Sequence, residues 1–533
     1  MTPSGVQIPE GAILPLVREV TGSPDPHALY AALSAGGTRP GTFLLESAET
    51  GAGSGERSLL GVSPALRLCC TARTVEVTAC SANGRSLLPW LAARLEGRLH
   101  ADTIRVSYPE PPLGPRDEVA RGKLASPLDA LRAAVFGPEV LAHPIDACYL
   151  AGGVFSYDLI ELFEALPPGR VAARPVPHFE FFIPDRLVII DHVRNRTVLV
   201  ANAFGGGDGE ANYHDAVRAI GELLSAVGSV AAKGPPRRTA AAAVTAPRSG
   251  ARVDLSDAEY QQLVVRLKRH IVAGDVFQIV ASRTFELPCP DPLAAYAELR
   301  AANPSPYLFY LVGEQSTVFG ASPETAVKVH GSPRRVVIRP IAGTAPRGRY
   351  SDGQLDADLD ARREAALRLD EKETAEHMML VDLARNDVAR VSRPGTRQVR
   401  RLLAVDRYAH VMHLVSEVEG ELAEDLDALH AYAAAMNMGT LVGAPKLRAA
   451  QLLREVEASR RGAYGGAVGY LTHDGTLDTA IVIRAAVVSD GIASVRAGAG
   501  IVFDSEPVSE AQETRQKAEA VLRAISATGG GRG

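Results

Sequence analysis

The chain has 533 residues, and at roughly 150 residues per domain this length predicts two or more layered units rather than a small binding module. A hydrophobic content of 46% with 22% charged residues is typical of a globular protein with a large core. The net charge of -5 without a dense Lys/Arg tract argues against a nucleic-acid partner, and no apolar run of about 18 residues suggests a membrane span. We therefore expect a cytoplasmic protein that acts on a small polar molecule.

Four segments in the first half are predicted to be strands, because they are rich in β-branched or aromatic residues and are bounded by turn residues. These segments are GTFLLES (41–47), ALRLCCTARTVEVTA (65–79), DACYLAGGVFSYDL (146–159) and RLVIIDHVRNRTVLVAN (186–202). Residues 228–250 are rich in Ala, Pro, Gly and Arg and lack apolar periodicity, which predicts a flexible linker. The chain is therefore expected to divide into an amino-terminal region, 1–227, and a carboxyl-terminal region, 251–527.

The carboxyl-terminal region is predicted to begin with a helix. Ser256 and Glu259 have capping-box spacing, and apolar residues recur at helical intervals up to Gly274. Further helices are predicted at 371–386 and 509–524. Strand-like segments lie at 276–287, 318–324, 334–344, 464–472, 479–488 and 494–503. This mixture predicts an α+β fold with largely antiparallel sheets.

Two of the predicted helices each carry a pair of glutamates on one face. Glu373 and Glu376 lie three residues apart in the first helix, and Glu510 and Glu513 repeat the spacing in the second, with Lys517 one turn further. If the helices meet across a cleft, these carboxylates suit a hard cation such as Mg²⁺, which prefers oxygen ligands. The alternative is a pair of solvated helix faces with ordinary Glu/Lys pairing, and the spacing alone leaves both interpretations open.

Glycines follow two of the apparent strands. Gly343 precedes Thr344, and Gly498 and Gly500 flank Ala499. Their bare backbone amides would suit an anion. Glycine at the end of a strand also forms simple bulges and turns, so this pattern too has two interpretations.

Two ionisable side chains lie within apolar segments. Arg484 lies in a strand-like run, where a cation needs a carboxylate from the protein or from a ligand. A dicarboxylate substrate would satisfy it, and so would an internal salt bridge. His413 would exchange protons near neutral pH, although a histidine in apolar surroundings is more often a hydrogen-bonded core residue.

Eight motifs occur in order along residues 256–526: NPSPYLFYL, FGASPE, PIAGTAPRG, EKETAEHMMLVDLARND, HVMHLVSEVEGEL, GAPKLRAAQ, RRGAYGGAVGYL and AGAGIVFDSEPVSEAQETRQKA. Together they closely resemble the chorismate-utilising enzymes and, within them, the component I (large) subunits of anthranilate synthases. FLLES and AGGVFSYDL resemble the regulatory part of the same family. The resemblance implies an α/β sandwich of two large, mostly antiparallel sheets flanked by helices, with the active-site cleft in the carboxyl-terminal region.

The resemblance also implies ligands for particular residues, carried over by motif. Glu376 and Glu513 would hold Mg²⁺, with Glu373 and Glu510 nearby, either directly or through water. The residues that would contact chorismate are Gly343, Thr344, Tyr464, Arg484, Gly498, Ala499 and Gly500.

The implied reaction is that of a lyase, which combines chorismate with ammonia and releases anthranilate and pyruvate in the first committed step of tryptophan biosynthesis. Glu324, in GASPE, would protonate the departing hydroxyl, and His413 is the family residue linked to the later loss of pyruvate. Gln278 and Lys517 are further candidate catalytic residues.

Individual residues separate this chain from its siblings in the family. Relatives that use water as the nucleophile carry a lysine base where this chain has Gln278, and aminodeoxychorismate synthases carry a nucleophilic lysine where it has Ala342. Two alternatives remain: a 2-amino-2-deoxyisochorismate synthase of secondary metabolism, which stops before pyruvate loss, and an inactive regulatory homologue. Val442 replaces the usual serine of the GT(L/V)SGAPK motif, and Ala281 stands where proline is frequent.

Two partners are implied. The chain lacks the cysteine nucleophile motif of a glutamine amidotransferase, so a separate glutaminase subunit, component II, would supply ammonia. L-tryptophan would act as a feedback inhibitor in a pocket built from Ser47 in FLLES and from Pro306, Tyr307 and Leu308 in NPSPYL. The leucine replaces a common methionine with little change of volume, so inhibition is expected to survive.

Overall fold

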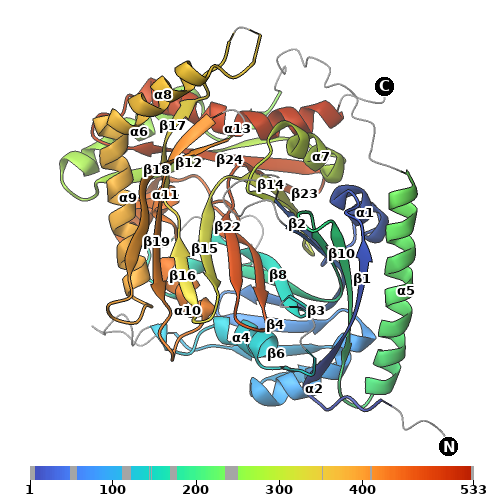
Figure 1. Cartoon of the computed structure of the whole chain (residues 1–533). Helices are drawn as coiled ribbons and strands as arrows, with labels where there is room; N and C mark the ends of the chain where they lie inside the picture. Colours follow the sequence, from blue (N-terminus) through green and yellow to red (C-terminus); the bar gives the residue numbers. More distant parts are fainter. Residues whose placement is uncertain are drawn as a thin grey trace, which may run out of the picture.

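The structure is a computed structural model, and it describes residues 6–47, 57–110, 122–142, 145, 147–168, 177–233, 250–350, 352–408 and 411–529. Its strands form one hydrogen-bonded network that is folded into two layers, with helices on the outside (Figure 1). None of the helices described is long and apolar enough to cross a membrane.

The first layer, which we call the β19 sheet, pairs antiparallel strands and contains the glycine-rich segment around Gly343. Both β17 (Ile341–Pro346) and β16 (Arg335–Ile338) pair with β19 (Val411–Glu421), whose other neighbour is β18 (Gln398–Arg407). From β16 the pairing continues through β15 (Thr325–His330), β22 (Leu477–Ile481), β21 (Ala467–Thr472) and β8 (Leu150–Phe155). Because β8 comes from the amino-terminal region, its pairing with β21 joins the two predicted regions.

The second layer, which we call the β24 sheet, is also antiparallel. It contains β11 (Arg252–Val253), β20 (Gly443–Ala444), β12 (Gln278–Pro288), β24 (Ile492–Ile501), β23 (Ala485–Ser489), β14 (Thr317–Ser322), β13 (Tyr307–Val312) and β2 (Phe43–Glu46). Here β2 of the amino-terminal region pairs with β13, so both sheets are shared between the two regions.

Two long strands, β3 (Arg57–Thr71) and β9 (Phe179–Asp191), connect the layers. The start of β3 pairs with β2 of the β24 sheet, and the start of β9 pairs with β8 of the β19 sheet. Their own ladder is irregular where Pro64 lies opposite Pro184, because proline gives no N–H to a ladder. The two predicted sheets are therefore continuous. The remaining connecting strands are β1 (Ala12–Thr21), β4 (Thr74–Ala79), β5 (Arg98–His100), β6 (Thr103–Ser107), β7 (Glu139–Val140) and β10 (Arg196–Phe204).

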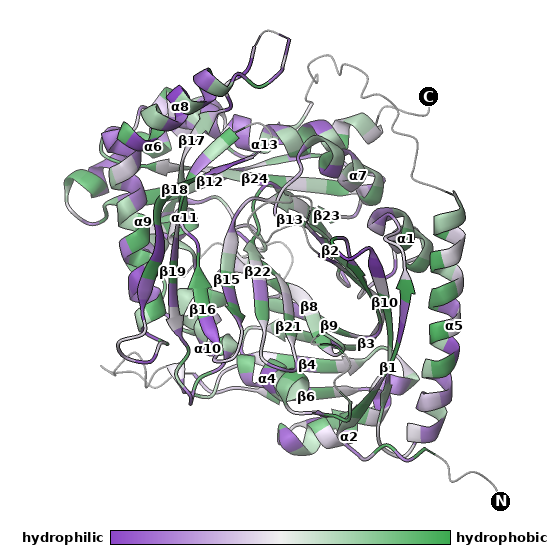
Figure 2. Cartoon of the chain, viewed as in Figure 1, coloured by the Kyte–Doolittle hydropathy of each residue, from purple (hydrophilic) through white to green (hydrophobic). Residues whose placement is uncertain are grey.

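Helices cover the outer faces of both layers, and Figure 2 shows hydrophobic and hydrophilic residues alternating along those such as α5. Apolar side chains of α9 and α10 pack in one core with β15, β16 and β19, and those of α1, α5, α7 and α13 pack in a second core against the β24 sheet. The helices are α1 (Pro26–Leu33), α2 (Ala82–Arg94), α4 (Leu128–Phe136), η1 (Tyr157–Leu162), α5 (Gly209–Lys233), α6 (Asp257–Val272), α7 (Pro292–Ala302), α8 (Ala357–Leu369), α9 (Glu371–Ala389), α10 (Ala428–Ala435), α11 (Gly439–Val442), α12 (Lys446–Val456) and α13 (Pro507–Gly529).

The chain crosses from one sheet to the other at two points that matter for the site. The residues Pro323 and Glu324 lead from β14 in the β24 sheet to β15 in the β19 sheet. The segment Val482–Arg484 leads back, from β22 in the β19 sheet to β23 in the β24 sheet. Glu324 and Arg484 therefore lie where the layers exchange strands.

The predicted α+β class is confirmed, and so is the helix that Ser256 caps with a complete capping box. Three local predictions are wrong. Residues 479–488 are not one strand, because the chain changes sheets within them, and residues 334–344 are interrupted at Pro340. The linker does not begin at Gly228, because α5 continues to Lys233; residues 234–249 lie outside the described residues.

Candidate active site

The paired glutamates of α9 and α13 come together. Burial raises the pKa of Glu373, Glu376 and Glu510, and in each case neighbouring carboxylates of the group, including Glu513, add to the rise. None of the four residues is fully exposed, and Glu510 is buried. The faces predicted from the i, i+3 spacing thus turn toward each other instead of only toward solvent.

Two lysines partly balance this acidic group. The Nζ atom of Lys372 lies 3.9 Å from Glu376, and that of Lys517 lies 2.6 Å from Glu513. Among the described residues, no three His, Cys, Asp or Glu side chains are arranged to hold a metal ion. However, Glu510 Oε2 is buried without a hydrogen-bond partner. Because Mg²⁺ usually takes one or two carboxylates and leaves its other positions to water and substrate, the residues present fit this ion.

Glu324 is a buried carboxylic acid at the first crossing between the sheets. Its backbone carbonyl accepts a hydrogen bond of 3.0 Å from Ile481, which fixes the crossing. Burial raises the pKa of Glu324 to about 8, and the Thr440 hydroxyl and the charge of Lys517 lower it only in part. The side chain is therefore mostly protonated at neutral pH and can donate a proton.

His413 lies on β19, opposite the glycine-rich turn of β17. Its Nδ1 atom is 2.9 Å from Thr344 Oγ1 and 3.3 Å from the carbonyl oxygen of Gly343. Burial lowers the pKa of His413 to about 4, and the charge of Arg484 adds to the lowering. With Nδ1–H donating to the carbonyl, the neutral ring leaves Nε2 as a proton acceptor.

Gly343 also brings this turn against the acidic group. Its φ of 76° is a backbone conformation that favours glycine. A Cβ atom there would lie only 3.1 Å from Glu373 Oε2. The turn therefore joins the His413 and Glu373 sides of the site.

Arg484 is a partly buried cation at the second crossing between the sheets. Its φ of 50° lies in the left-handed region, which costs a non-glycine residue about 1–2 kcal/mol. Burial lowers its pKa, and in the described part of the chain no carboxylate forms an ion pair with its guanidinium. The internal salt bridge considered from the sequence is therefore not found there, and the side chain is free to receive an anion.

The glycines of β24 give room to two polar side chains. A Cβ atom on Gly498 would lie 2.9 Å from the Tyr464 hydroxyl, and one on Gly500 would lie 2.7 Å from Gln278 Nε2. Between them, Ala499 points to the opposite face of the strand, so it offers only its backbone to the site. Burial raises the pKa of Tyr464 to about 12, so its hydroxyl remains a donor. Gln278 Oε1 is buried, and no group in the described part of the chain forms a hydrogen bond with it.

Lys517 connects these parts. Its Nζ atom donates a hydrogen bond of 3.2 Å to the carbonyl of Gly498, pairs with Glu513 and lies close enough to Glu324 to lower that pKa. The structure thus gathers the predicted catalytic, metal-binding and chorismate-binding residues into one connected group. It offers a protonated acid, a neutral histidine, a cluster of carboxylates and a cation that no carboxylate of the described residues pairs with.

Three nearby residues were not predicted as site residues. Thr440 lies beside Glu324, and Lys372 lies within the acidic group. Lys446 is held by Asp387 at 2.6 Å and by the carbonyl of Ala435 at 2.7 Å. Thr440 and Lys446 belong to the GTLVGAPK motif, and Lys372 lies four residues before Glu376, so these patterns were the available signals.

A separate cavity of about 1480 Å³ lies between the two sheets, and all four residues predicted for inhibitor binding line it. Ser47 Oγ is buried there and has no hydrogen-bond partner among the described residues, which resume at Arg57. The Tyr307 hydroxyl lies 3.0 Å from both Thr325 Oγ1 and Asp478 Oδ1. Because Thr325 directly follows Glu324, the wall of this cavity continues into the candidate active site. The four predicted residues are Ser47, Pro306, Tyr307 and Leu308.

Comparisons with known proteins identify the family of this chain. Residues 112–523 match the family described as chorismate binding enzyme. Anthranilate synthase component 1 of Vibrio cholerae is 49% identical over 505 residues, which cover 94% of each protein, and that of Escherichia coli is 48% identical over 509 residues, covering 94% of this chain and 95% of its own. The crystal structure of anthranilate synthase component I from Streptococcus pneumoniae matches with a TM-score of 0.66 and 27% identity, over 89% of this chain and 94% of that one. The chain therefore belongs to the family of chorismate binding enzymes.

Proposed function

We propose that this chain is the large subunit of an anthranilate synthase and converts chorismate and ammonia to anthranilate and pyruvate. The names of its relatives support this reaction, and the candidate site contains groups for each step. The observation that carries the choice of nucleophile is Gln278, whose buried Oε1 has no hydrogen-bond partner within the described ranges. An amide oxygen accepts a hydrogen bond from ammonia but is too weak a base to activate water.

Binding of chorismate would use the cation and the backbone of the site. Arg484 would clamp the enolpyruvyl carboxylate, because it has no carboxylate partner of its own in the described residues. The turns at Gly343 and at Gly498 to Gly500 would supply backbone contacts, and Tyr464 would donate from its hydroxyl. Glu376 and Glu513 would hold Mg²⁺, with Glu373 and Glu510 nearby, either directly or through water; the bound ion would neutralise the ring carboxylate and draw electron density from the ring.

Proton transfers would then follow from the two perturbed pKa values. Glu324 donates a proton to the 4-hydroxyl as it leaves, because burial keeps its carboxyl group protonated near neutral pH. Lys517 lies close to Glu324 and stabilises the carboxylate that remains. Ammonia adds at C2, and neutral His413 is placed to assist the later proton loss that accompanies release of pyruvate.

Two substitutions are relevant to the choice between this reaction and its siblings. Ala342, next to Gly343, has no nucleophile, so it cannot form the covalent intermediate expected of a lysine at this position. Val442, which replaces the usual serine, is fully buried among apolar residues such as Tyr260 and Leu452. Its side chain therefore packs in a core instead of contacting substrate, and the retained His413 favours the complete reaction over 2-amino-2-deoxyisochorismate synthesis.

A partner subunit would supply the ammonia, and an inhibitor would bind in a cavity outside the candidate active site. A glutaminase subunit, component II, would supply ammonia in the assembled enzyme. L-tryptophan would bind in the cavity between the sheets, where Pro306, Tyr307 and Leu308 form a wall and no described residue forms a hydrogen bond with the Ser47 hydroxyl. Since Ser47 and β2 belong to residues 1–227, this region would serve regulation while residues 251–527 carry the reaction.

Product analysis tests the proposal. The purified chain is incubated with chorismate, MgCl₂ and ammonium chloride at mildly alkaline pH, and anthranilate fluorescence and pyruvate are followed together. Equal amounts of both products are expected. An aminated product without pyruvate would instead indicate a 2-amino-2-deoxyisochorismate synthase, and no consumption of chorismate would indicate an inactive homologue.

A further inference from the structure

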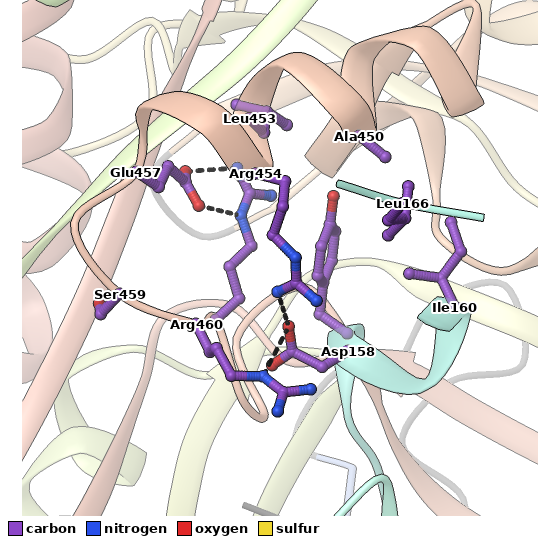
Figure 3. A pocket seen from close by; sticks show the side chains of 11 residues that line it. Asp158, Ile160, Leu166, Ala450, Leu453, Arg454, Glu457, Ser459 and Arg460 are labelled. Carbon is purple, nitrogen blue, oxygen red and sulfur yellow. Dashed lines mark hydrogen bonds and ion pairs between the residues drawn. The ribbon is translucent and has the colours of Figure 1, made fainter. Parts of the chain in front are cut away.

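A dense group of charged residues lies between α12 and η1, outside the group of residues described above. Figure 3 shows Asp158 of η1 between Arg454 and Arg460, with Glu457 at the end of α12. The cavity they line is only about 20 Å³, so the side chains nearly fill it. The loop that follows, residues 457–464, ends at Tyr464 of the candidate site.

Arg461 is the member of this group that reaches the candidate site. Its side chain is 2% exposed and lies between two tyrosine rings, 4.6 Å from the centre of the Tyr157 ring and 5.8 Å from that of Tyr464. Its Nε and NH2 atoms donate to both carboxylate oxygens of Glu457, at 2.9 and 2.7 Å. The charge of Glu457 raises the pKa of Arg461 against the opposing effect of burial, so the cation is permanent.

The same guanidinium also binds two other segments of the site. NH1 donates to the carbonyl of Leu441, and NH2 donates to the carbonyl of Val280, both at 2.6 Å. Leu441 directly follows Thr440, the neighbour of Glu324, and Val280 lies two residues after Gln278. One buried side chain thus contacts the three segments that carry Thr440, Gln278 and Tyr464.

The loop that carries Arg461 is fixed in turn by the amino-terminal region. The Gly462 N–H donates to Asp158 Oδ2 at 2.8 Å, and the Gly462 carbonyl accepts from Tyr157 N–H and from Ser156 Oγ, each at 2.8 Å. These bonds leave the loop backbone little freedom, so the position of Arg461 is defined from both sides.

We propose that Arg461 is a positioning residue of the chorismate site, which holds Tyr464, Gln278 and Thr440 in the arrangement that binds and converts the substrate. This inference rests on the proposed function, because it assigns Arg461 a task in that reaction. An ion pair with Glu457 alone would not require the contacts with Leu441 and Val280. A lysine would keep the charge, but its single ammonium group cannot reproduce a planar fork that binds a carboxylate and two carbonyls while stacking on two rings.

The test compares Arg461→Lys with Arg454→Lys in otherwise unchanged full-length protein. Arg454 is a suitable control because it lines the same pocket and pairs with Asp158 and Glu161, but forms no hydrogen bond to Leu441 or Val280. The kcat and KM for chorismate are measured with ammonium chloride, and Tm is measured on the same samples. We expect Arg461→Lys to lower kcat/KM by about 100-fold with a raised KM, since small displacements of substrate-contacting groups have effects of this size. Arg454→Lys is expected to stay within about 3-fold of the unmodified chain.

A double-mutant cycle with Tyr464→Phe separates positioning from a general loss of structure. If Arg461 acts through the Tyr464 hydroxyl, Arg461→Lys costs about ten times less in the Tyr464→Phe chain than in the unmodified chain. Equal losses in both backgrounds would overturn the inference. If the unmodified chain itself forms no anthranilate, the proposed function fails, and Arg461 has no such task; normal turnover with an unaffected Arg461→Lys variant would refute only the role of Arg461.

Discussion

Replacing Glu324 with glutamine is expected to stabilise the folded protein while it abolishes activity. Burial raises the pKa of Glu324 from 4.5 to about 8, so the folded chain retains a proton that the unfolded chain loses between these pH values. The contribution of Glu324 to the free energy of unfolding is therefore complete below pH 4.5, decreases as the pH rises and reaches its lowest value above pH 8. At about 1.4 kcal/mol per pH unit, the free energy of unfolding is lower by roughly 3 kcal/mol at pH 7 than below pH 4.5. A glutamine is neutral at every pH, so the Glu324→Gln variant does not lose this stability.

The measurement is Tm from pH 5 to pH 9 for the unmodified chain and for Glu324→Gln. In a chain of this length, about 1 kcal/mol corresponds to roughly 1 °C in Tm, so the variant should unfold about 3 °C higher at pH 7. The advantage should be small at pH 5 and level off above pH 8. Glu519→Gln is the control, because Glu519 forms an exposed ion pair with Arg523 and should give a nearly constant difference.

Activity provides the second half of this prediction. Without its proton donor, the Glu324→Gln variant should lose at least about 100-fold in kcat. For the unmodified chain, kcat/KM at constant free ammonia should fall as the pH passes about 8, because the acid form is the one that reacts. A variant that is less stable than the unmodified chain at pH 8, a Tm difference that does not change with pH, or retained turnover would each contradict the role of Glu324 as a buried acid.

Further predictions concern the other ligands of the site and the cavity between the sheets. Arg484→Met should raise KM for chorismate about 100-fold without lowering Tm, since this cation has no carboxylate partner to lose among the described residues. A chelator should abolish anthranilate formation and Mg²⁺ should restore it, while Glu510→Gln should raise the Mg²⁺ concentration needed for half-activation by about 10-fold. Ser47→Ala should weaken tryptophan inhibition about 10-fold and leave kcat unchanged, as measured by inhibition curves at fixed chorismate. Val442→Ser should lower Tm by about 2 °C, because the new hydroxyl is buried among apolar side chains, and should leave kcat within about 2-fold; a gain in activity would show that the serine hydroxyl has a role in the site.

Local sequence patterns predicted much of the fold and the pair of glutamates on each of the two helices. The i, i+3 spacing placed Glu373 with Glu376 and Glu510 with Glu513, and the capping box placed the start of α6. Whether the two acidic faces meet depends on how α9 and α13 lie on two different sheets, which no short-range pattern specifies. The resemblance to the family predicted this meeting, because it implies that the motifs of both helices belong to one site.

Local sequence patterns do not predict the two crossings between the sheets. The run 479–488 has the composition of one strand, and only its pairing partners reveal that it leaves the β19 sheet and enters the β24 sheet at Arg484. Pairing partners far away in the chain decide this, since composition is the same for either sheet. Arg484 has its positive φ at this crossing, and its charge reaches His413 on β19.

Val442 and Ala281, the two residues that depart from the family pattern, lie in the same part of the core. Val442 and Ala281 belong to one apolar cluster, together with residues of α6, α12 and η1, and both are fully buried. A valine is larger than the usual serine, and an alanine is smaller than the frequent proline, so the two departures change the volume of this cluster in opposite directions. Cores tolerate combined substitutions that conserve total volume better than single ones. We therefore interpret the two departures as a local repacking of this apolar cluster.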